Sequence, residues 1–296
     1  LDANRKDTSA IAIYGQELNE RTWRMARMNL AIHALSAKGL GERWGDTFAR
    51  DIHPGVEMDY VLANPPFNIK DWVRNTDDKR WIYGVPPEKN ANFGWMQHII
   101  SKLGPQGEAG VVMANGTMTT NTSSEGEIRK NMLEDDVVSS VITLPSQLFR
   151  GTQIPVCVWF FAKDKGPGSK GSIDRRGQFL LIDARSLGHM IDRTERTFSD
   201  EDIQQIANTF RTWRGRESAK GGYEDVPGFC KSVSLEEIRE ANYALTPGRY
   251  VGFAETEEDN EPIDEKIARL TAELTAALDE SARLDAVVRE QLGRLG

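Results

Sequence analysis

Short apolar runs and stretches with a helical repeat alternate along most of the chain. The short runs are rich in β-branched and aromatic residues and predict strands, at 10–14, 60–63, 110–114, 137–144, 155–162 and 179–183. Apolar positions three and four apart predict helices, at 19–37, 93–103, 125–134 and 200–213. A further short helix is expected after Ser234, because Glu237 completes a capping-box pattern. Helices between apolar strands predict an α/β fold with a sheet covered on both faces, and the strands flanking 151–155 are expected to pair antiparallel.

The stretch 59–67 is the most informative one in the chain. Residues 60–63 form a short apolar run that predicts a buried strand, and the run stops at Asn64-Pro65-Pro66-Phe67. Two consecutive prolines lack backbone N–H groups and fix φ, so the strand must end in a stiff turn. The turn therefore places an amide and an aromatic ring at the carboxyl end of a strand, where open α/β sheets bind ligands.

The chemistry of this turn suits a flat heterocycle that carries an amino group. The Asn64 side chain has a carbonyl acceptor, and the carbonyl of Pro65 adds a rigidly held second acceptor. Two acceptors aimed at one point fit an exocyclic –NH2 group, and Phe67 offers a face for stacking. The alternative is an ordinary strand-ending turn with Phe67 in the core.

Two acidic residues follow other strand or turn signals. Glu17 comes just after the predicted strand 10–14, where a carboxylate can accept hydrogen bonds from ribose hydroxyls; alternatively it stabilises the start of the next helix. Asp46 follows a Gly-rich turn in the stretch 45–48, which is expected to lead a short strand. Asp46 can accept from an adenine amino group, or it can cap its own turn.

The connection 68–92 is long and polar and mixes basic with aromatic residues, including Arg80, Trp81 and Tyr83. Long loops in compact domains are often functional, and this mixture suits contact with a nucleic-acid strand. A loop packed on its own aromatic residues is the alternative.

The carboxyl-terminal part of the chain changes character. Residues 255–265 contain seven acidic residues and no basic one, which predicts a solvated linker. Apolar residues then recur at alternating spacings of four and three, which predicts a coiled-coil-like helix; the seam consists of Ile263, Ile267, Leu270, Leu274, Ala277, Ser281, Leu284, Val288, Gln291 and Leu295. The seam is expected to bury against a helix of a partner subunit or against its own domain.

Composition excludes several classes of protein. Hydrophobic residues make up 39% and charged residues 28% of the 296 positions, and no apolar run approaches the ~20 residues of a membrane span. The net charge of −8 argues against a broad basic face that grips DNA alone. Cys157 and Cys230 lack a CxxC spacing and are expected to be free thiols in the reducing cytoplasm. The four histidines show no metal-ligand spacing.

The chain resembles one family in nearly its whole length: the modification (M) subunit of type I restriction-modification systems, an N6-adenine DNA methyltransferase. The matching pieces include Gly15-Gln16-Glu17, Gly45-Asp46-Thr47, Asn64-Pro65-Pro66-Phe67 and, further along, the stretches 23–32, 80–84, 90–93, 154–155, 182–185 and 245–250. Asn-Pro-Pro-Phe alone is moderately specific, whereas the ordered set is highly specific.

The resemblance implies a Rossmann-like class I methyltransferase fold that uses S-adenosyl-L-methionine. It assigns cofactor binding to Glu17, Asp46, Thr47 and Asn64, with Glu17 on the ribose and Asp46 on the adenine amino group. It assigns catalysis to Asn64, Pro65, Pro66 and Phe67, with two carbonyls on the N6 amino group of a flipped adenine and the ring stacked on the base. No metal is implied.

The same resemblance implies partners and a domain plan. The partners are DNA, a specificity (S) subunit docked through the terminal helix, a second M subunit and a restriction (R) subunit, without a membrane. The plan is a methyltransferase core at 1–165, an α+β extension at 166–253, and the acidic linker with its heptad helix at 254–296. The family has a helical domain and a Gly-rich loop upstream of Gly-Gln-Glu. Because the sequence starts at Leu1, we expect a sheet that lacks its first strand and a polypeptide that is inactive alone.

Two other functions fit parts of the pattern. A methyltransferase acting on a protein glutamine amide uses a similar Asn-Pro-Pro turn, but usually with Tyr where this chain has Phe67. A non-catalytic assembly subunit built around the heptad helix is the second alternative.

Overall fold

The computed structural model of the chain describes residues 11–149 and 153–253, together with scattered positions between 267 and 284. The chain divides into two compact units, Leu1–Ala254 and Glu255–Gly296. In the part of the chain that is described, no helix is both long enough and apolar enough to cross a lipid bilayer.

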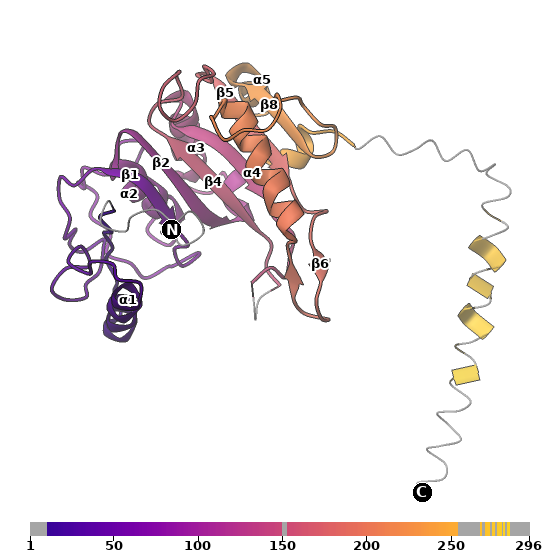
Figure 1. The fold of residues 1–296 in the computed structure, drawn as a ribbon, viewed down its shortest axis with the longest axis horizontal. Coiled ribbons are helices and arrows are strands. Elements are labelled where there is room, and N and C mark those ends of the chain that lie inside the picture. Colours follow the sequence, from indigo (N-terminus) through magenta and orange to yellow (C-terminus); the bar gives the residue numbers. More distant parts are fainter. Residues whose placement is uncertain are drawn as a thin grey trace, which may run out of the picture. The chain divides into compact units, whose positions relative to one another are not determined.

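The first unit is built on a mixed six-stranded sheet (Figure 1). Its order is β1 (Met58–Ala63), β2 (Leu103–Ala114), β4 (Val156–Ala162), β3 (Val138–Thr143), β5 (Gln178–Asp183) and β8 (Cys230–Ser234). β1 and β2 are parallel, β4 is antiparallel to both β2 and β3, and β5 is parallel to β3. The predicted antiparallel pairing across 151–155 is confirmed. The carboxyl ends of β1, β2, β3 and β5 consequently lie at one edge of the sheet.

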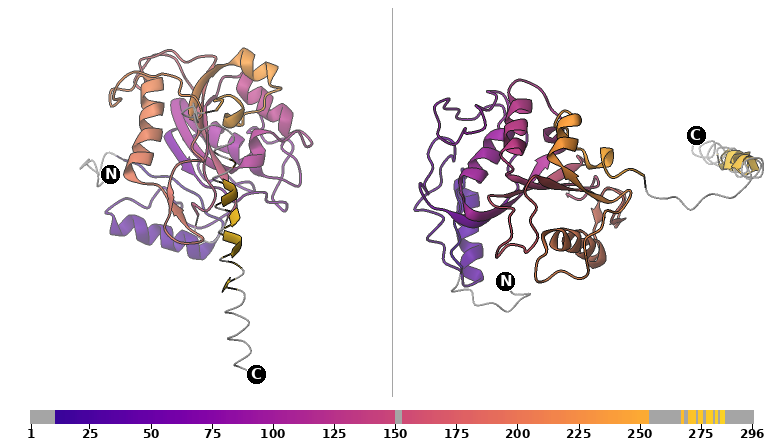
Figure 2. Two further views of the ribbon diagram at one scale, coloured as in Figure 1. Left: turned by 90° about the vertical axis from the view of Figure 1, so that its right-hand side faces the viewer. Right: turned by 90° about the horizontal axis from the view of Figure 1, so that it is seen from above.

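Helices cover both faces of this sheet, as predicted (Figure 2, right-hand view). α2 (Asn92–Ser101), α3 (Glu125–Glu134) and α5 (Leu235–Glu240) enclose one apolar core with the sheet. α4 (Asp200–Arg214) encloses a second core on the opposite face, where Trp213 is fully buried. The remaining elements are α1 (Glu20–Ile32), the short hairpin β6 (His189–Met190) and β7 (Arg196–Thr197), and the 3-10 turns η3 (Asn115–Met118) and η4 (Pro247–Arg249).

Side-chain caps begin three of the helices, and the capping box predicted at Ser234 is confirmed. Asn19 caps α1, and Ser199 and Ser234 form complete capping boxes at α4 and α5. Each cap satisfies backbone N–H groups that the first helical turn leaves without partners. α1 ends at Ile32, five residues before the expected end at residue 37, because Ala34 adopts a left-handed conformation with φ 54°.

Two predicted strands are wrong for the described residues. Residues 11–13 are not in a strand, and Tyr14 makes only an isolated parallel bridge to Gly39. The stretch 45–48 forms a turn rather than the start of a strand. At 45–48 the carbonyls of Gly45, Thr47 and Phe48 accept hydrogen bonds from the side chains of Gln16 and Arg80 instead of from a neighbouring strand.

The strand β1 exists but is not buried as predicted. Among the described residues it pairs only with β2, so it is the outermost strand of the sheet. Tyr60 is 60% and Leu62 is 87% exposed as a result. Both line an apolar groove of ≈ 430 Å³ between the sheet and α4, to which Phe160, Ile206 and Phe210 also contribute.

The second unit is described only in part. Its described residues between 267 and 284 are helical. The seam positions Ile267, Leu270, Leu274 and Leu284 among them have exposed side chains. The other apolar seam positions, Ile263, Val288 and Leu295, and the acidic stretch 255–265 lie outside the described residues.

Candidate active site

The turn at Asn64 lies where the sequence places it, at the carboxyl end of β1. Asn64 is exposed, Pro65 is buried and Phe67 is half-buried. The described residues give the Asn64 side chain no hydrogen-bond partner. The amide is thus free to meet a ligand, while the buried proline beside it holds the turn against the protein.

Hydrogen bonds between two asparagines fix the chain directly after this turn. Asn68 adopts φ 56°, a conformation that Asn tolerates better than most residues. Its backbone N–H donates to Asn92 Oδ1 at 2.9 Å, and Asn92 Nδ2 donates back to Asn68 Oδ1 at 2.9 Å. Because Asn92 is the buried first residue of α2, the turn is attached to the helix that follows it.

Backbone hydrogen bonds bring the other two predicted segments together. Gly45 N donates to the Glu17 carbonyl at 2.8 Å, which places Asp46 beside Glu17. The Gln16 side chain reinforces this contact, since Nε2 donates to the carbonyls of Gly45 at 3.2 Å and Arg50 at 2.7 Å. Two carboxylates that lie 29 positions apart in the sequence therefore occupy one region.

Each of these carboxylates accepts a hydrogen bond from a nearby backbone N–H through one of its two oxygens. Asp46 Oδ1 accepts a hydrogen bond from Phe48 N at 2.7 Å. Asp46 therefore caps its own turn, as the alternative interpretation of this residue predicted. Glu17 Oε1 accepts from Asn19 N at 2.8 Å, next to the start of α1. The hydrogen bonds of the described residues leave Asp46 Oδ2 and Glu17 Oε2 available. Both residues are only partly buried, so these oxygens can accept from the hydroxyl and amino groups of a nucleoside.

An aromatic cluster connects the turn at Asp46 with the segment that follows the Asn64 turn. The rings of Phe48 and Trp72 have centroids 4.7 Å apart, and those of Phe48 and Trp95 are 4.4 Å apart. Ile69 and Trp81 pack on the same cluster. The cluster gives the two halves of the candidate site a common apolar support.

In the long connection 68–92, the side chains of Arg80, Trp81 and Tyr83 are largely withdrawn from solvent. Trp81 and Tyr83 are 8% and 5% exposed, and the Arg80 side chain is 12% exposed. The expectation that these three side chains contact a nucleic-acid strand is wrong, because they pack against Phe48 and the core. The packed-loop alternative describes them correctly.

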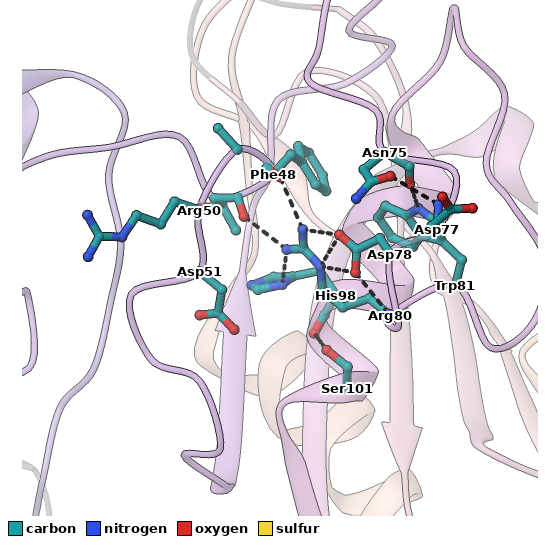
Figure 3. Close-up of polar contacts among 12 residues, drawn as sticks. Phe48, Arg50, Asp51, Asn75, Asp77, Asp78, Arg80, Trp81, His98 and Ser101 are labelled. Atoms are coloured by element: carbon teal, nitrogen blue, oxygen red, sulfur yellow. Dashed lines mark hydrogen bonds and ion pairs between the residues drawn. The ribbon is translucent and has the colours of Figure 1, made fainter.

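Arg80 is the polar centre of this packed region (Figure 3). Its guanidinium donates to the carboxylate of Asp78, to the backbone carbonyl of Thr47 and to Nδ1 of His98. Burial and the Arg80 charge lower the pKa of His98 to about 4, which keeps the imidazole neutral at pH 7. Because Arg is always protonated and only donates, Nδ1 must be the acceptor and Nε2 must carry the hydrogen.

The residues that support the site could not be identified from the sequence. Gln16, Arg80 and Asn92 lie inside the stretches that carry the family resemblance, but nothing in their spacing indicates which atoms they bond. Thr47, assigned to the cofactor by resemblance, is buried with its carbonyl bound to Arg80. In the described part of the chain, no cluster of three His, Cys, Asp or Glu side chains could hold a metal ion.

Comparison with known families identifies the family of this chain. The family model described as N-6 DNA Methylase matches residues 1–259, which include the Glu17, Asp46 and Asn64 segments. The chain belongs to the N-6 DNA Methylase family. The match takes in every strand of the six-stranded sheet.

Relatives in this family are similar over the whole chain. The HindI methylase subunit, a type I restriction enzyme subunit of Haemophilus influenzae, is 43% identical over 100% of this chain and 64% of its own length. The corresponding MjaIX subunit of Methanocaldococcus jannaschii is 37% identical over 100% of this chain and 52% of its own length. The chain thus spans between about half and two thirds of the length of these N-6 DNA Methylase relatives.

A solved structure gives the same fold. The methyltransferase subunit of a type I restriction-modification system from Streptococcus thermophilus is 28% identical, with a TM-score of 0.67 over 80% of this chain and 48% of that one. The mixed sheet with helices on both faces is therefore the methyltransferase type of α/β fold that the resemblance implied.

Proposed function

We propose that this chain is the methyltransferase subunit of a type I restriction-modification system and transfers a methyl group from S-adenosyl-L-methionine to N6 of adenine in DNA. The observation that carries the proposal is the turn at the end of β1, with an exposed Asn64 amide, a buried Pro65 and a half-buried Phe67. Family membership and the identity with methylase subunits support it.

The proposed roles follow from the chemistry of the amino group. The nitrogen lone pair of adenine N6 is delocalised into the ring, so it is a poor nucleophile. The Asn64 side-chain carbonyl and the Pro65 backbone carbonyl accept hydrogen bonds from its two hydrogens and favour a tetrahedral nitrogen. Phe67 stacks on the extruded base. Positioning and electrostatics supply the rate enhancement, and a strongly basic side chain is unnecessary.

The free oxygens at Glu17 and Asp46 fit the nucleoside part of S-adenosyl-L-methionine. Glu17 would accept from the ribose hydroxyls and Asp46 from the adenine amino group, while buried Thr47 shapes the turn between them. When bound, the cofactor supplies an electrophilic methyl group. Asn64 would lie at the meeting point of cofactor and base.

The test is methyl transfer by the complete natural chain, assembled with its partner subunits, from labelled cofactor to DNA. Asn64→Ala removes one of two acceptors and is expected to reduce kcat by about 10²- to 10³-fold, as loss of one preorganised hydrogen-bonding group does in other enzymes. Asn29→Ala, which removes an exposed amide from α1, is the matched control and should retain full activity.

The outcomes separate this proposal from its two alternatives. Label that appears on a peptide containing a glutamine substrate, and never on DNA, would identify a protein glutamine-amide methyltransferase. Unchanged methylation in Asn64→Ala would indicate an assembly subunit without a catalytic role. Loss of methylation with an intact complex supports the enzyme.

We further propose that the helix of the second unit docks the S subunit or a second M subunit. The described seam residues Ile267, Leu270 and Leu274 are 59%, 48% and 61% exposed. Apolar side chains at heptad spacing need a facing helix to leave water. The restriction subunit and DNA would join the same assembly.

A further inference from the structure

The segment 45–53 carries Asp46 but contains no helix or strand. Side chains from other parts of the chain bind its backbone instead. Gln16 bonds the carbonyls of Gly45 and Arg50, and Lys102 Nζ donates to the His53 carbonyl at 2.7 Å. A segment held in this way has a geometry that depends on each of its supports.

Arg80 binds the backbone of this segment at the two residues that directly follow Asp46. Nη1 donates to the Thr47 carbonyl at 2.9 Å and Nη2 to the Phe48 carbonyl at 3.3 Å. The N–H of Phe48 in turn donates to Asp46 Oδ1 at 2.7 Å. The guanidinium therefore fixes the two peptide groups that define the turn on which the Asp46 carboxylate sits.

Arg80 is itself rigidly held (Figure 3). Nε lies 2.9 Å from both oxygens of Asp78, Nη2 lies 2.5 Å from Oδ2, and Nη1 lies 3.0 Å from His98 Nδ1. Its guanidinium carbon lies 5.6 Å and 5.4 Å from the ring centroids of Phe48 and Trp81. Only a planar fork with several N–H groups can serve all these partners at once, which a lysine ammonium cannot do.

We propose that Arg80 is a positioning residue that fixes the Asp46 carboxylate for the adenine end of the cofactor, and that it ties this carboxylate to the connection 68–92. The inference rests on the proposed function. In this role Arg80 needs no contact of its own with cofactor or base. It acts through the backbone of Thr47 and Phe48, so its effect on cofactor affinity passes through Asp46.

The test is a double-mutant cycle on the affinity of the complete natural chain, in its assembled complex, for S-adenosylhomocysteine. Binding is measured by calorimetry, and the melting temperature of each variant is recorded. Arg80→Lys is expected to raise Kd about tenfold, within the range of coupled polar networks. In an Asp46→Asn background the same change should raise Kd by less than about threefold, because the group that it positions has already been altered.

A second variant and a matched control accompany the cycle. Asp78→Asn leaves Arg80 in place but loosens it, so Kd should rise by a smaller factor. Arg176→Lys changes an arginine that pairs with Asp174 two residues earlier, as Arg80 does with Asp78, but on an exposed surface. It should leave Kd unchanged.

The results distinguish a positioning role from a purely structural one. If Arg80→Lys raises Kd by the same factor in the natural chain and in Asp46→Asn, the inference is overturned. An unchanged Kd in Arg80→Lys would overturn it as well. If Arg80→Lys does not fold, the Asp78→Asn cycle with Asp46→Asn decides in the same way. A natural complex that binds no S-adenosylhomocysteine would overturn the proposed function as well, whereas binding with additive effects would overturn only the role of Arg80.

Discussion

Gln16, Arg80 and Lys102 satisfy backbone polar groups that a helix or strand would otherwise satisfy. Each comes from a different part of the chain, and each ends on a carbonyl of the segment 45–53. Unpaired buried backbone groups cost about 1–3 kcal/mol each. The conformation of the segment that carries Asp46 therefore depends on three long side chains rather than on a helix or strand.

His98 should contribute stability that is lost on acidification. Burial and the charges of Arg80 and Lys102 lower its pKa to about 4, against the opposing effects of Asp51 and Asp78. The unfolded chain has the ordinary value of about 6.5. This contribution is complete above pH 6.5, and up to about 3 kcal/mol is lost as the pH falls from 6.5 to about 4, because only the unfolded chain takes up the proton.

Urea unfolding at pH 7 and pH 4.5 tests this prediction. The free energy of unfolding of His98→Gln should fall less between the two pH values than that of the natural protein, since glutamine does not titrate and still offers an acceptor to Arg80. Equal losses in both proteins would show that His98 is protonated in the folded state. The depressed pKa values of Asp51 and Asp78 act below their ordinary value of 3.8, outside this window.

At the level of secondary structure, the helices that surround the core and five of the six strands of the sheet were predictable, whereas β8 was not. Their signals are local: capping boxes at Ser199 and Ser234, β-branched residues in β3 and an apolar run in β5. The failures, at 11–14 and 45–48, fall in segments whose conformation is set by distant partners such as Gly39 and Gln16.

In the candidate site, too, the features with a local sequence signal were predictable and the long-range contacts were not. Asn64, Pro65 and Phe67 could be placed because two prolines must end a strand. That Gly45 bonds Glu17 could not be foreseen, because pairings over about 30 positions depend on tertiary packing. Exposure of the β1 side chains depends on which strands flank it, and the apolar run alone does not contain that information.

Gly39 provides a test of one such long-range contact. Its carbonyl accepts from Gly15 N at 3.0 Å, and a Cβ at this position would lie 2.1 Å from the Ile13 carbonyl. Gly39→Ala must push the 13–17 segment away and displace Glu17. We expect the affinity for S-adenosylhomocysteine to fall at least about tenfold, at a cost in stability of about 1–3 kcal/mol.

Gly222→Ala is the control for this substitution, because no atom lies within 4 Å of the added Cβ. Calorimetric binding and thermal unfolding of both variants give the comparison. Unchanged binding by Gly39→Ala would mean that the position of Glu17 does not depend on the bridge between Tyr14 and Gly39.

For the whole molecule, the heptad unit is predicted to control assembly without affecting the first unit. Leu270→Asp combined with Leu274→Asp places charge on the seam and should abolish co-sedimentation with the other subunits. Affinity for S-adenosylhomocysteine should remain within about twofold, because the seam residues belong to a different compact unit from Glu17 and Asp46. Ala272→Asp with Thr275→Asp puts the same charge on another face of the helix and should leave assembly intact. Retained assembly in the seam variant would exclude the proposed docking role.

The turn at Asn64 is carried by the outermost strand of the described sheet, since β1 is paired only on its β2 side. A strand held along one side opens locally at a lower free energy than one held along both. Any polypeptide that pairs with the other side of β1 would therefore reduce the fluctuations of Asn64 and Pro65. Thermodynamic linkage makes this reciprocal: a base held by the turn would tighten the pairing by the same factor. Under the proposed function, strand pairing along this edge and adenine binding at the turn are therefore thermodynamically linked.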